Sequence, residues 1–297
     1  MSYEPALMEP TIPPPHPSPH APIRFTPPPC ACDAHCHIFG PGDKFPFAAD
    51  RAYTPPDAGI EDFQHLQLRL GLSRAVFVQA SCHGTDNTAM VDALQRGHGR
   101  YAGVAMSDES FSDADIAGLH DAGVRGTRFN FVAHLGGAPE LGEFWRIVHR
   151  VVPFGWHIVL HFDAKDLPQY ASLLDDMPCA YIIDHMARVD ASAGVEQAPF
   201  LQLLELMRDE RCWVKVSGAE RLTAGGTPPY DDVVPYARAL IAAAPDRVLW
   251  GTDWPHPNVR HMADDGDLVD VLADYAPDEL TRNRILVDNP GTLYDFS

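Results

Sequence analysis

Beyond residue 30 the chain alternates short apolar or β-branched segments with longer stretches of helical spacing, and this alternation strongly constrains the fold. Eight short segments predict strands, at residues 31–38, 75–80, 101–106, 124–131, 157–162, 181–186, 213–218 and 248–253. Between most of them apolar residues recur at helical intervals, as Phe200, Leu203, Leu204 and Met207 do. Eight alternating units predict an α/β fold of the (β/α)8 TIM barrel type. A doubly wound open sheet is the alternative that the strand count leaves open.

The 297 residues exceed the usual size of one domain, but α/β barrels of this length fold as single domains. Eleven of the 28 prolines fall within residues 1–29, and proline supplies no backbone donor to a helix or a sheet. We therefore expect residues 1–29 to form a proline-rich extended arm that lies on the barrel or on a neighbouring subunit. Residues 30–297 are expected to form the barrel domain.

The net charge of −19, with a pI near 5.0, disfavours nucleic acid and anionic membrane surfaces as partners. An anionic substrate would therefore have to be held by local arginines, against the repulsion of the negative charge of the whole protein. Residues 1–20 lack the basic and apolar regions of a secretory signal, and no apolar run reaches the roughly 18–20 residues of a membrane span. We expect a cytoplasmic protein whose six cysteines are reduced, and a homo-oligomer is left open.

The segment ACDAHCHIFG at residues 31–40 concentrates cysteines and histidines on the first predicted strand. Because residues two apart on a strand face the same side, His35 and His37 are expected to point into the barrel, with Asp33 below them. The face toward the helices is expected to carry Cys32, Ala34 and Cys36. A structural zinc knuckle is disfavoured, because these cysteines lack a C-x2-C-like spacing and a second pair.

Polar side chains recur near the carboxyl ends of the predicted strands, where TIM barrels build their active sites. They are His35, His37, Gln79, Ser81, Arg125, Arg128, His161, His185, Ser217, Arg221, Asp253 and His256. Taken singly, a histidine on an apolar strand is usually a satisfied core residue. Burying four histidines and a carboxylate at one barrel mouth without a role would be unfavourable, so the set predicts an active site.

Several motifs carry a resemblance to a known family: DAHCHIFGP (33–41), VLHFD (159–163), IIDHMAR (182–188) and WGTDWPHPN (250–258). From about residue 25 onward the chain resembles the amidohydrolase superfamily, in its branch of lactonases and decarboxylases. Within that branch it is most similar to the 2-pyrone-4,6-dicarboxylate lactonases and the related 4-sulfomuconolactone hydrolases. The resemblance implies a hydrolase of aromatic catabolism and lignin breakdown, which opens the ring of a small anionic lactone, 2-pyrone-4,6-dicarboxylate, to give 4-oxalomesaconate.

The resemblance also implies roles for individual residues. Asp253 would be the general base that accepts a proton from the attacking water. Three histidines would surround the lactone carbonyl and stabilise its developing oxyanion, namely His35, His37 and His185. The side chains implied to hold the anionic groups of the substrate are Arg125, Arg128, Arg221, Tyr53, Ser81 and His256. Arginine suits this task because its planar guanidinium donates two parallel hydrogen bonds to a carboxylate.

One residue departs from the family pattern. The pyrone dicarboxylate lactonases work without metal and carry a tyrosine where this chain has His161, whereas metal-dependent members of the superfamily use a histidine there as a ligand. A divalent metal, zinc or manganese, would then be held by His35, His37, His161 and Asp253, although metal-free catalysis is left open. Three alternatives stay open: a lactonase for a sulfonated muconolactone, a metal-dependent decarboxylase, and a non-catalytic barrel that binds a small acid.

Overall fold

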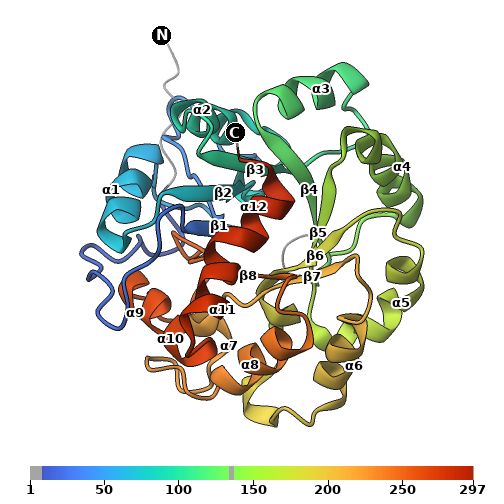
Figure 1. The fold of residues 1–297 in the computed structure, drawn as a ribbon. Helices are drawn as coiled ribbons and strands as arrows, with labels where there is room; N and C mark the ends of the chain where they lie inside the picture. The colour runs from blue at the N-terminus through green and yellow to red at the C-terminus, as the bar shows by residue number, and fades with distance from the viewer. Residues whose placement is uncertain (1–8, 134–136, 297) are drawn as a thin grey trace.

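A computed structural model describes residues 9–133 and 137–296, and it contains one parallel sheet of eight strands in sequential order from β1 to β8 (Figure 1). The strands are β1 (Cys32–Cys36), β2 (Arg74–Val78), β3 (Tyr101–Ala105), β4 (Val124–Asn130), β5 (His157–His161), β6 (Tyr181–Ile183), β7 (Cys212–Lys215) and β8 (Val248–Leu249). The sheet closes on itself, because the amide of Ala34 donates to the carbonyl of Trp250 and the amide of Asp253 donates to that of His35, each at 2.8 Å. The prediction of a TIM barrel is confirmed, and the open sheet is excluded.

Helices surround the barrel (Figure 1). They are α1 (Ile60–Leu70), α2 (Thr88–Arg96), α3 (Asp113–Asp121), α4 (Leu141–Val151), α5 (Leu167–Asp175), α6 (Ala198–Leu206), α7 (Ala219–Leu222), α8 (Val234–Ala243), α9 (Asp265–Asp270), α10 (Leu272–Tyr275), α11 (Glu279–Asn283) and α12 (Asn289–Tyr294). Short turns of tighter helix lie between them, at Ser81–His83, Val152–Phe154, Ala164–Asp166, Asp184–Arg188 and Ala191–Ala193, with a π-helical turn at Arg284–Asp288. In α4 the buried residues Phe144, Ile147, Val148 and Val151 fall at i, i+3, i+4 and i+7, so one stripe packs on the barrel.

The barrel interior is filled mostly by small and branched side chains, with two aromatic residues among them. Val76 and Val78 of β2 face inward, whereas Phe77 faces outward and packs against Phe63 of α1. The other members of the interior cluster are Cys32, Ala34, Ala102, Val104, Val159, Ile182, Trp213, Leu249 and Tyr294. Tyr294 comes from α12, which crosses one end of the barrel (Figure 1). That end is therefore closed, and a ligand must enter from the opposite one.

The first strand corrects one expectation. Cys32 and Ala34 pack in the barrel interior rather than against the helices, and only Cys36 of the three belongs to the outer core. The physical reason is a shift of the β1–β2 register between Asp33 and Cys36, which interrupts the strict alternation of faces. Asp33 lies between the interior residues Cys32 and Ala34 and so faces the other side of the strand, where its carboxylate accepts hydrogen bonds from the hydroxyl and amide of Thr252.

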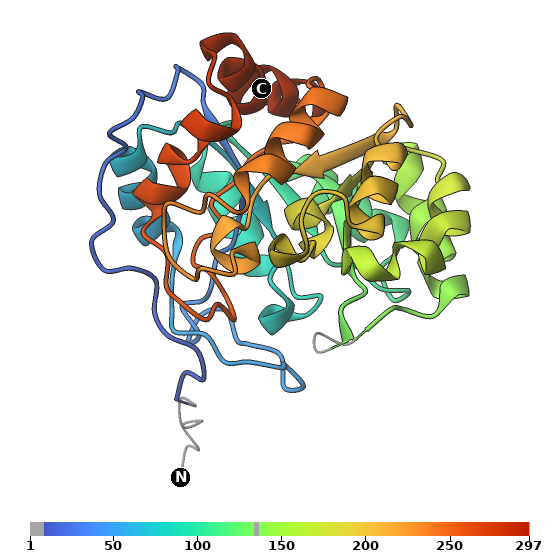
Figure 2. The same ribbon diagram turned by 90° about the horizontal axis from the view of Figure 1, so that it is seen from below.

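The described part of the proline-rich arm, residues 9–29, forms no helix or strand and runs along one side of the molecule (Figure 2). The amides of Ile23 and Arg24 donate to Asp270 of α9, and the amide of His20 donates to Asp264. Residues 1–8 of the predicted arm lie outside the described residues. No helix in the described ranges has the length and apolarity required to cross a membrane.

Candidate active site

The carboxyl ends of the strands surround a pocket of about 140 Å³. Its lining consists of His37, Tyr53, Ala80, Ser81, Arg128, His161, His185, Arg188, Arg221, Asp253, Pro257 and Asn258. Eight of the residues predicted from the sequence are therefore brought together here, and His35 lies buried directly against Asp253. Among the described lining residues three are arginines and one is a carboxylate, so the pocket is built for an anion.

Asp253 stands at the centre of the pocket. Its Oδ1 lies 3.1 Å from Nε2 of His37, 3.5 Å from Nε2 of His35 and 3.9 Å from Nε2 of His185. Its Oδ2 contacts the guanidinium of Arg221. Burial alone would raise the pKa of Asp253, but the charge of Arg221 and the surrounding histidines hold it well below its usual range. The carboxylate is therefore ionised at neutral pH.

Two of the histidines are oriented by groups outside the pocket. Nδ1 of His37 donates to the carbonyl of Val78 at 2.8 Å, which leaves Nε2 toward Asp253. Nδ1 of His185 lies 2.9 Å from the hydroxyl of Ser217, and burial lowers the pKa of His185 to about 4. His185 is therefore a neutral imidazole at neutral pH, fixed by Ser217.

A buried ion network beneath the pocket was not predicted from the sequence. Nζ of Lys215 lies 2.9 Å from Nδ1 of His35 and 3.2 Å from Oδ1 of Asp184, and neither Lys215 nor Asp184 is exposed. Nε of Arg128 donates to the other oxygen of Asp184 at 3.0 Å. Burial and the charge of Lys215 lower the pKa of His35, so its ring is neutral. Nδ1 of His35 lies between this ammonium and Oδ1 of Asp184, which is 3.3 Å away, whereas its Nε2 has no hydrogen-bond partner among the described residues.

The turn after β6 brings a further cation to the pocket. Residues His185 to Arg188 all have a left-handed backbone, with φ between 49° and 53°. Gly218, at φ 80°, lies under this turn, and a Cβ there would come within 3.2 Å of the Cβ of His185. The turn directs Arg188 into the pocket, where Asp163 accepts a hydrogen bond from its Nε at 2.6 Å. No glycine marks this turn in the sequence, so Arg188 could not be found from a turn signal.

His161 lies at the end of β5 and lines the pocket. Its Nδ1 donates to Oδ1 of Asn130 at 2.9 Å, while its Nε2 has no hydrogen-bond partner among the described residues. Burial and the nearby charge of Arg128 lower the pKa of His161 well below its usual range. A neutral imidazole therefore presents its acceptor nitrogen at the wall of the pocket.

Two predicted substrate-binding residues lie elsewhere. Arg125 is near the start of β4, where its guanidinium donates to the carbonyls of His120 and Val124 at the closed end of the barrel. Arg128 is three residues further along the strand, which places it at the open end. His256 is buried below the pocket wall, with Nε2 at 3.0 Å from Asp265 and Nδ1 at 3.7 Å from Glu220. The structure thus corrects the placement of both residues in the anion clamp.

The predicted metal ligands come together in part. His35, His37 and Asp253 form one group whose donor atoms could hold a metal ion, and His35, Asp184 and His185 form a second. His161 belongs to neither group. Moreover, the ammonium of Lys215 lies 2.9 Å from Nδ1 of His35, and Arg221 already contacts Asp253. A histidine and carboxylate cluster is therefore present, but the neighbouring cations Lys215 and Arg221 fit a divalent ion poorly.

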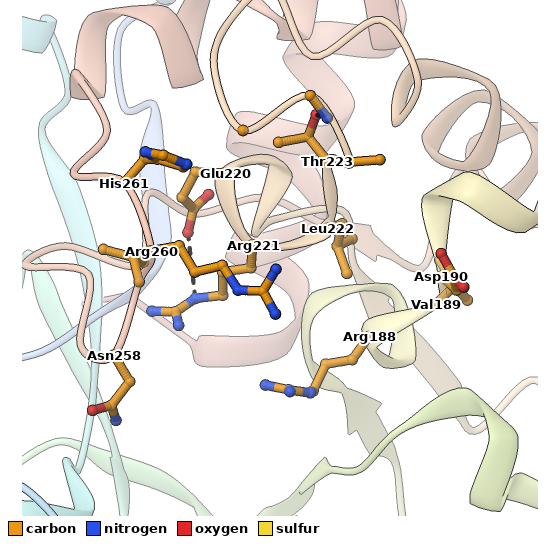
Figure 3. A pocket seen from close by; sticks show the side chains of 14 residues that line it. Arg188, Val189, Asp190, Glu220, Arg221, Leu222, Thr223, Asn258, Arg260 and His261 are labelled. Atoms are coloured by element: carbon orange, nitrogen blue, oxygen red, sulfur yellow. Dashed lines mark hydrogen bonds and ion pairs between the residues drawn. The ribbon is translucent and has the colours of Figure 1, made fainter.

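A second cavity, of about 560 Å³, adjoins the pocket of about 140 Å³ around Asp253, which we call the reaction pocket. The two cavities share Arg188, Arg221 and Asn258 (Figure 3). We call this cavity the outer chamber. It is lined by residues 188–190, 220–226 and 258–261. Arg221 on the one-turn helix α7 stands between the two spaces, since it contacts Asp253 on one side and lines the chamber on the other.

The sequence of this chain was compared with those of known proteins and protein families. The family model described as amidohydrolase matches residues 32–296. A 2-pyrone-4,6-dicarboxylate hydrolase from Comamonas testosteroni is 47% identical over 280 residues, covering 91% of this chain and 92% of that protein. A 4-sulfomuconolactone hydrolase from Rhizobium radiobacter is 42% identical over 278 residues, covering 92% of this chain and 93% of the relative.

A solved structure from Acinetobacter baumannii, described as a "probable 2-pyrone-4,6-dicarboxylic acid hydrolase" with citric acid bound, is also similar. It superimposes with a TM-score of 0.79 at 26% identity, and the match covers 90% of this chain and all of that one. The match of the family model over nearly the whole barrel, together with these relatives, shows that the chain belongs to the amidohydrolase family.

Proposed function

We propose that this protein is a lactonase that hydrolyses 2-pyrone-4,6-dicarboxylate to 4-oxalomesaconate. The observation that carries the proposal is the lining of the reaction pocket, in which three arginines accompany a single ionised carboxylate although the chain as a whole carries a net charge of −19. Such a pocket selects a small polyanion. The names of the relatives from Comamonas testosteroni and Acinetobacter baumannii support the same substrate class.

In this mechanism the oxygen of a water molecule attacks the lactone carbonyl while Asp253 accepts a proton from that water. The carbonyl oxygen becomes an oxyanion beside His37 and His185, which line the pocket, while His35 lies behind them with Nε2 3.5 Å from Asp253. The tetrahedral intermediate then collapses by breaking the bond between the carbonyl carbon and the ring oxygen. The leaving oxygen is an enolate, which takes the proton from Asp253, and the enol tautomerises to the keto acid.

Arg221 links substrate binding to this chemistry. It contacts Asp253 in the free enzyme, where its charge lowers the pKa of that carboxyl and so weakens it as a base. A substrate carboxylate that binds Arg221 competes for the same guanidinium, and the basicity of Asp253 rises as a result. We propose that Arg128 and Arg188 add positive charge around the bound anion, with Tyr53 and Ser81 as neighbouring donors.

We further propose that the reaction proceeds without a divalent metal. Lys215 and Arg221 supply positive charge at the two buried carboxylates, Asp184 and Asp253, where a metal ion would otherwise be expected. In this proposal His161 is a neutral residue of the pocket wall, rather than a metal ligand.

A second candidate substrate is 4-sulfomuconolactone, because relatives from Hydrogenophaga intermedia and Rhizobium radiobacter with that name are 40% and 42% identical. A sulfonate is an anion that the same arginines could bind. The test measures kcat/KM of the purified protein for both lactones, with loss of pyrone absorbance as the signal for the first. We expect the pyrone dicarboxylate to be preferred. A higher kcat/KM for the sulfonated lactone would replace the proposed substrate, and turnover of neither would reject the lactonase proposal.

A further inference from the structure

The outer chamber is much larger than the reaction pocket that it adjoins, at about 560 Å³ against about 140 Å³. Arg188, Arg221 and Asn258 line both spaces, so a ligand in the reaction pocket can extend into the chamber past these side chains. The side chains of Arg188, Arg221 and Arg260 extend into the same space (Figure 3). The chamber is therefore a continuation of the substrate site rather than a separate cleft.

Arg260 differs from the other two arginines of the chamber in having no partner within the part of the chain that the structure describes. Arg188 is held by Asp163, and Arg221 contacts both Asp253 and Glu220. Arg260 lies in the loop after β8, is exposed, and makes no hydrogen bond or ion pair with any other residue in the described ranges. Its guanidinium is the free cation of the chamber.

The acidic residues of the chamber do not neutralise Arg260. The carboxylate of Asp190 accepts hydrogen bonds from the amide and hydroxyl of Ser192, at 3.0 and 2.6 Å. Glu220 is 6% exposed and lies between Arg221 and the buried His256. By formal charge the lining of the chamber holds three arginines against these two carboxylates, a net charge of +1, and neither carboxylate contacts Arg260 among the described residues.

We propose that the outer chamber is a distal anion subsite, and that Arg260 is its specificity-determining residue. The subsite takes a carboxylate or sulfonate that the substrate carries on the side remote from the reacting carbonyl. It therefore favours lactones with two or more anionic groups over those with one. This inference rests on the proposed function only in placing the reacting lactone ring in the reaction pocket. The related structure from Acinetobacter baumannii has citric acid bound, and citrate therefore serves as the polyanionic probe below.

The test compares wild type with Arg260→Gln, using citrate as the probe and calorimetry as the readout. Arg69→Gln is the matched control. Arg69 is also exposed, and its substitution removes the same charge, but Arg69 lies on α1 beside a different cavity. We expect Arg260→Gln to raise the Kd of citrate about tenfold, in keeping with the loss of one charge-assisted hydrogen bond, and Arg69→Gln to leave it unchanged. All titrations are made at one ionic strength, because exposed charges are screened by salt.

The kinetic arm of the test uses the dianionic 2-pyrone-4,6-dicarboxylate and a pyrone with a single carboxylate. Arg260→Gln should raise KM for the dianion with kcat unchanged, and should leave the monoanion unaffected. Equal Kd values for citrate in wild type and Arg260→Gln, or no citrate binding by wild type, would overturn the subsite. If citrate binding depends on Arg260 while no pyrone is turned over, the subsite stands and the proposed function fails.

Discussion

Lys215 offers the sharpest test of the charge network beneath the site. Lys215→Met keeps the length of the side chain and removes its charge, which leaves Asp184 with Arg128 as its remaining cation. Breaking a buried ion pair costs about 3–5 kcal/mol, and the surviving contact at 3.0 Å places this case near 3 kcal/mol. For a chain of this length the entropy of unfolding is about 0.6 kcal/mol per kelvin, so Tm should fall by roughly 5 °C.

The matched control is Lys44→Met. Lys44 pairs with Asp92 at 2.8 Å, a shorter distance than the Lys215–Asp184 contact, but its side chain is 52% exposed. Exposed pairs contribute at most about 1 kcal/mol, so Tm should change by less than about 2 °C. The measurement is thermal unfolding followed by circular dichroism at pH 7. Equal melting temperatures for the two variants would refute the argument that burial makes the Lys215 pair costly to break.

Three further predictions concern the base, the metal and pH. Asp253→Asn should reduce kcat at least ~10³-fold, since a positioned base contributes ~10²–10⁴, and near-normal turnover would remove Asp253 from the mechanism. Dialysis against a chelator should leave kcat unchanged because cations already occupy the site, whereas a loss that zinc or manganese restores would contradict the metal-free proposal. Burial lowers the pKa of His256, but Asp265 and Glu220 overcome this and raise it to about 10, above the ordinary 6.5. Its stabilising effect is therefore complete below about pH 6.5 and is lost as pH rises through about 10. The Tm gap between wild type and His256→Gln should accordingly shrink between pH 6 and pH 10, and a gap that stays constant would refute this ionisation.

The fold was open to prediction because each strand carries its own apolar signal. Each of the eight predicted segments overlaps one strand of the barrel, and the errors lie at the ends of the segments. The segment 181–186 was predicted as a strand throughout, yet β6 ends at Ile183 because the backbone turns left-handed at His185. Strand ends depend on the neighbouring chain, which local apolar patterns do not record.

Alternation along the seventh strand also predicts part of the site. Trp213, Lys215 and Ser217 share one parity on the seventh segment, and the structure places Lys215 and Ser217 against His35 and His185. A lysine on the inward face of an apolar strand therefore predicts a buried ion pair near the site. The same argument separates Arg125 from Arg128, since residues three apart on a strand cannot share a face.

The sequence could not predict the backbone conformation that positions the charged side chains in the site. His185 to Arg188, Asp253 and His256 all have positive φ, a conformation that is unfavourable for residues other than glycine and persists only when surrounding contacts impose it. Those contacts are the long-range ones described above: Ser217 with His185, Asp163 with Arg188, Arg221 with Asp253, and Asp265 with His256. The anion pocket and the strained turns therefore depend on each other, because the paired charges hold the turns and the turns bring the charges to one place.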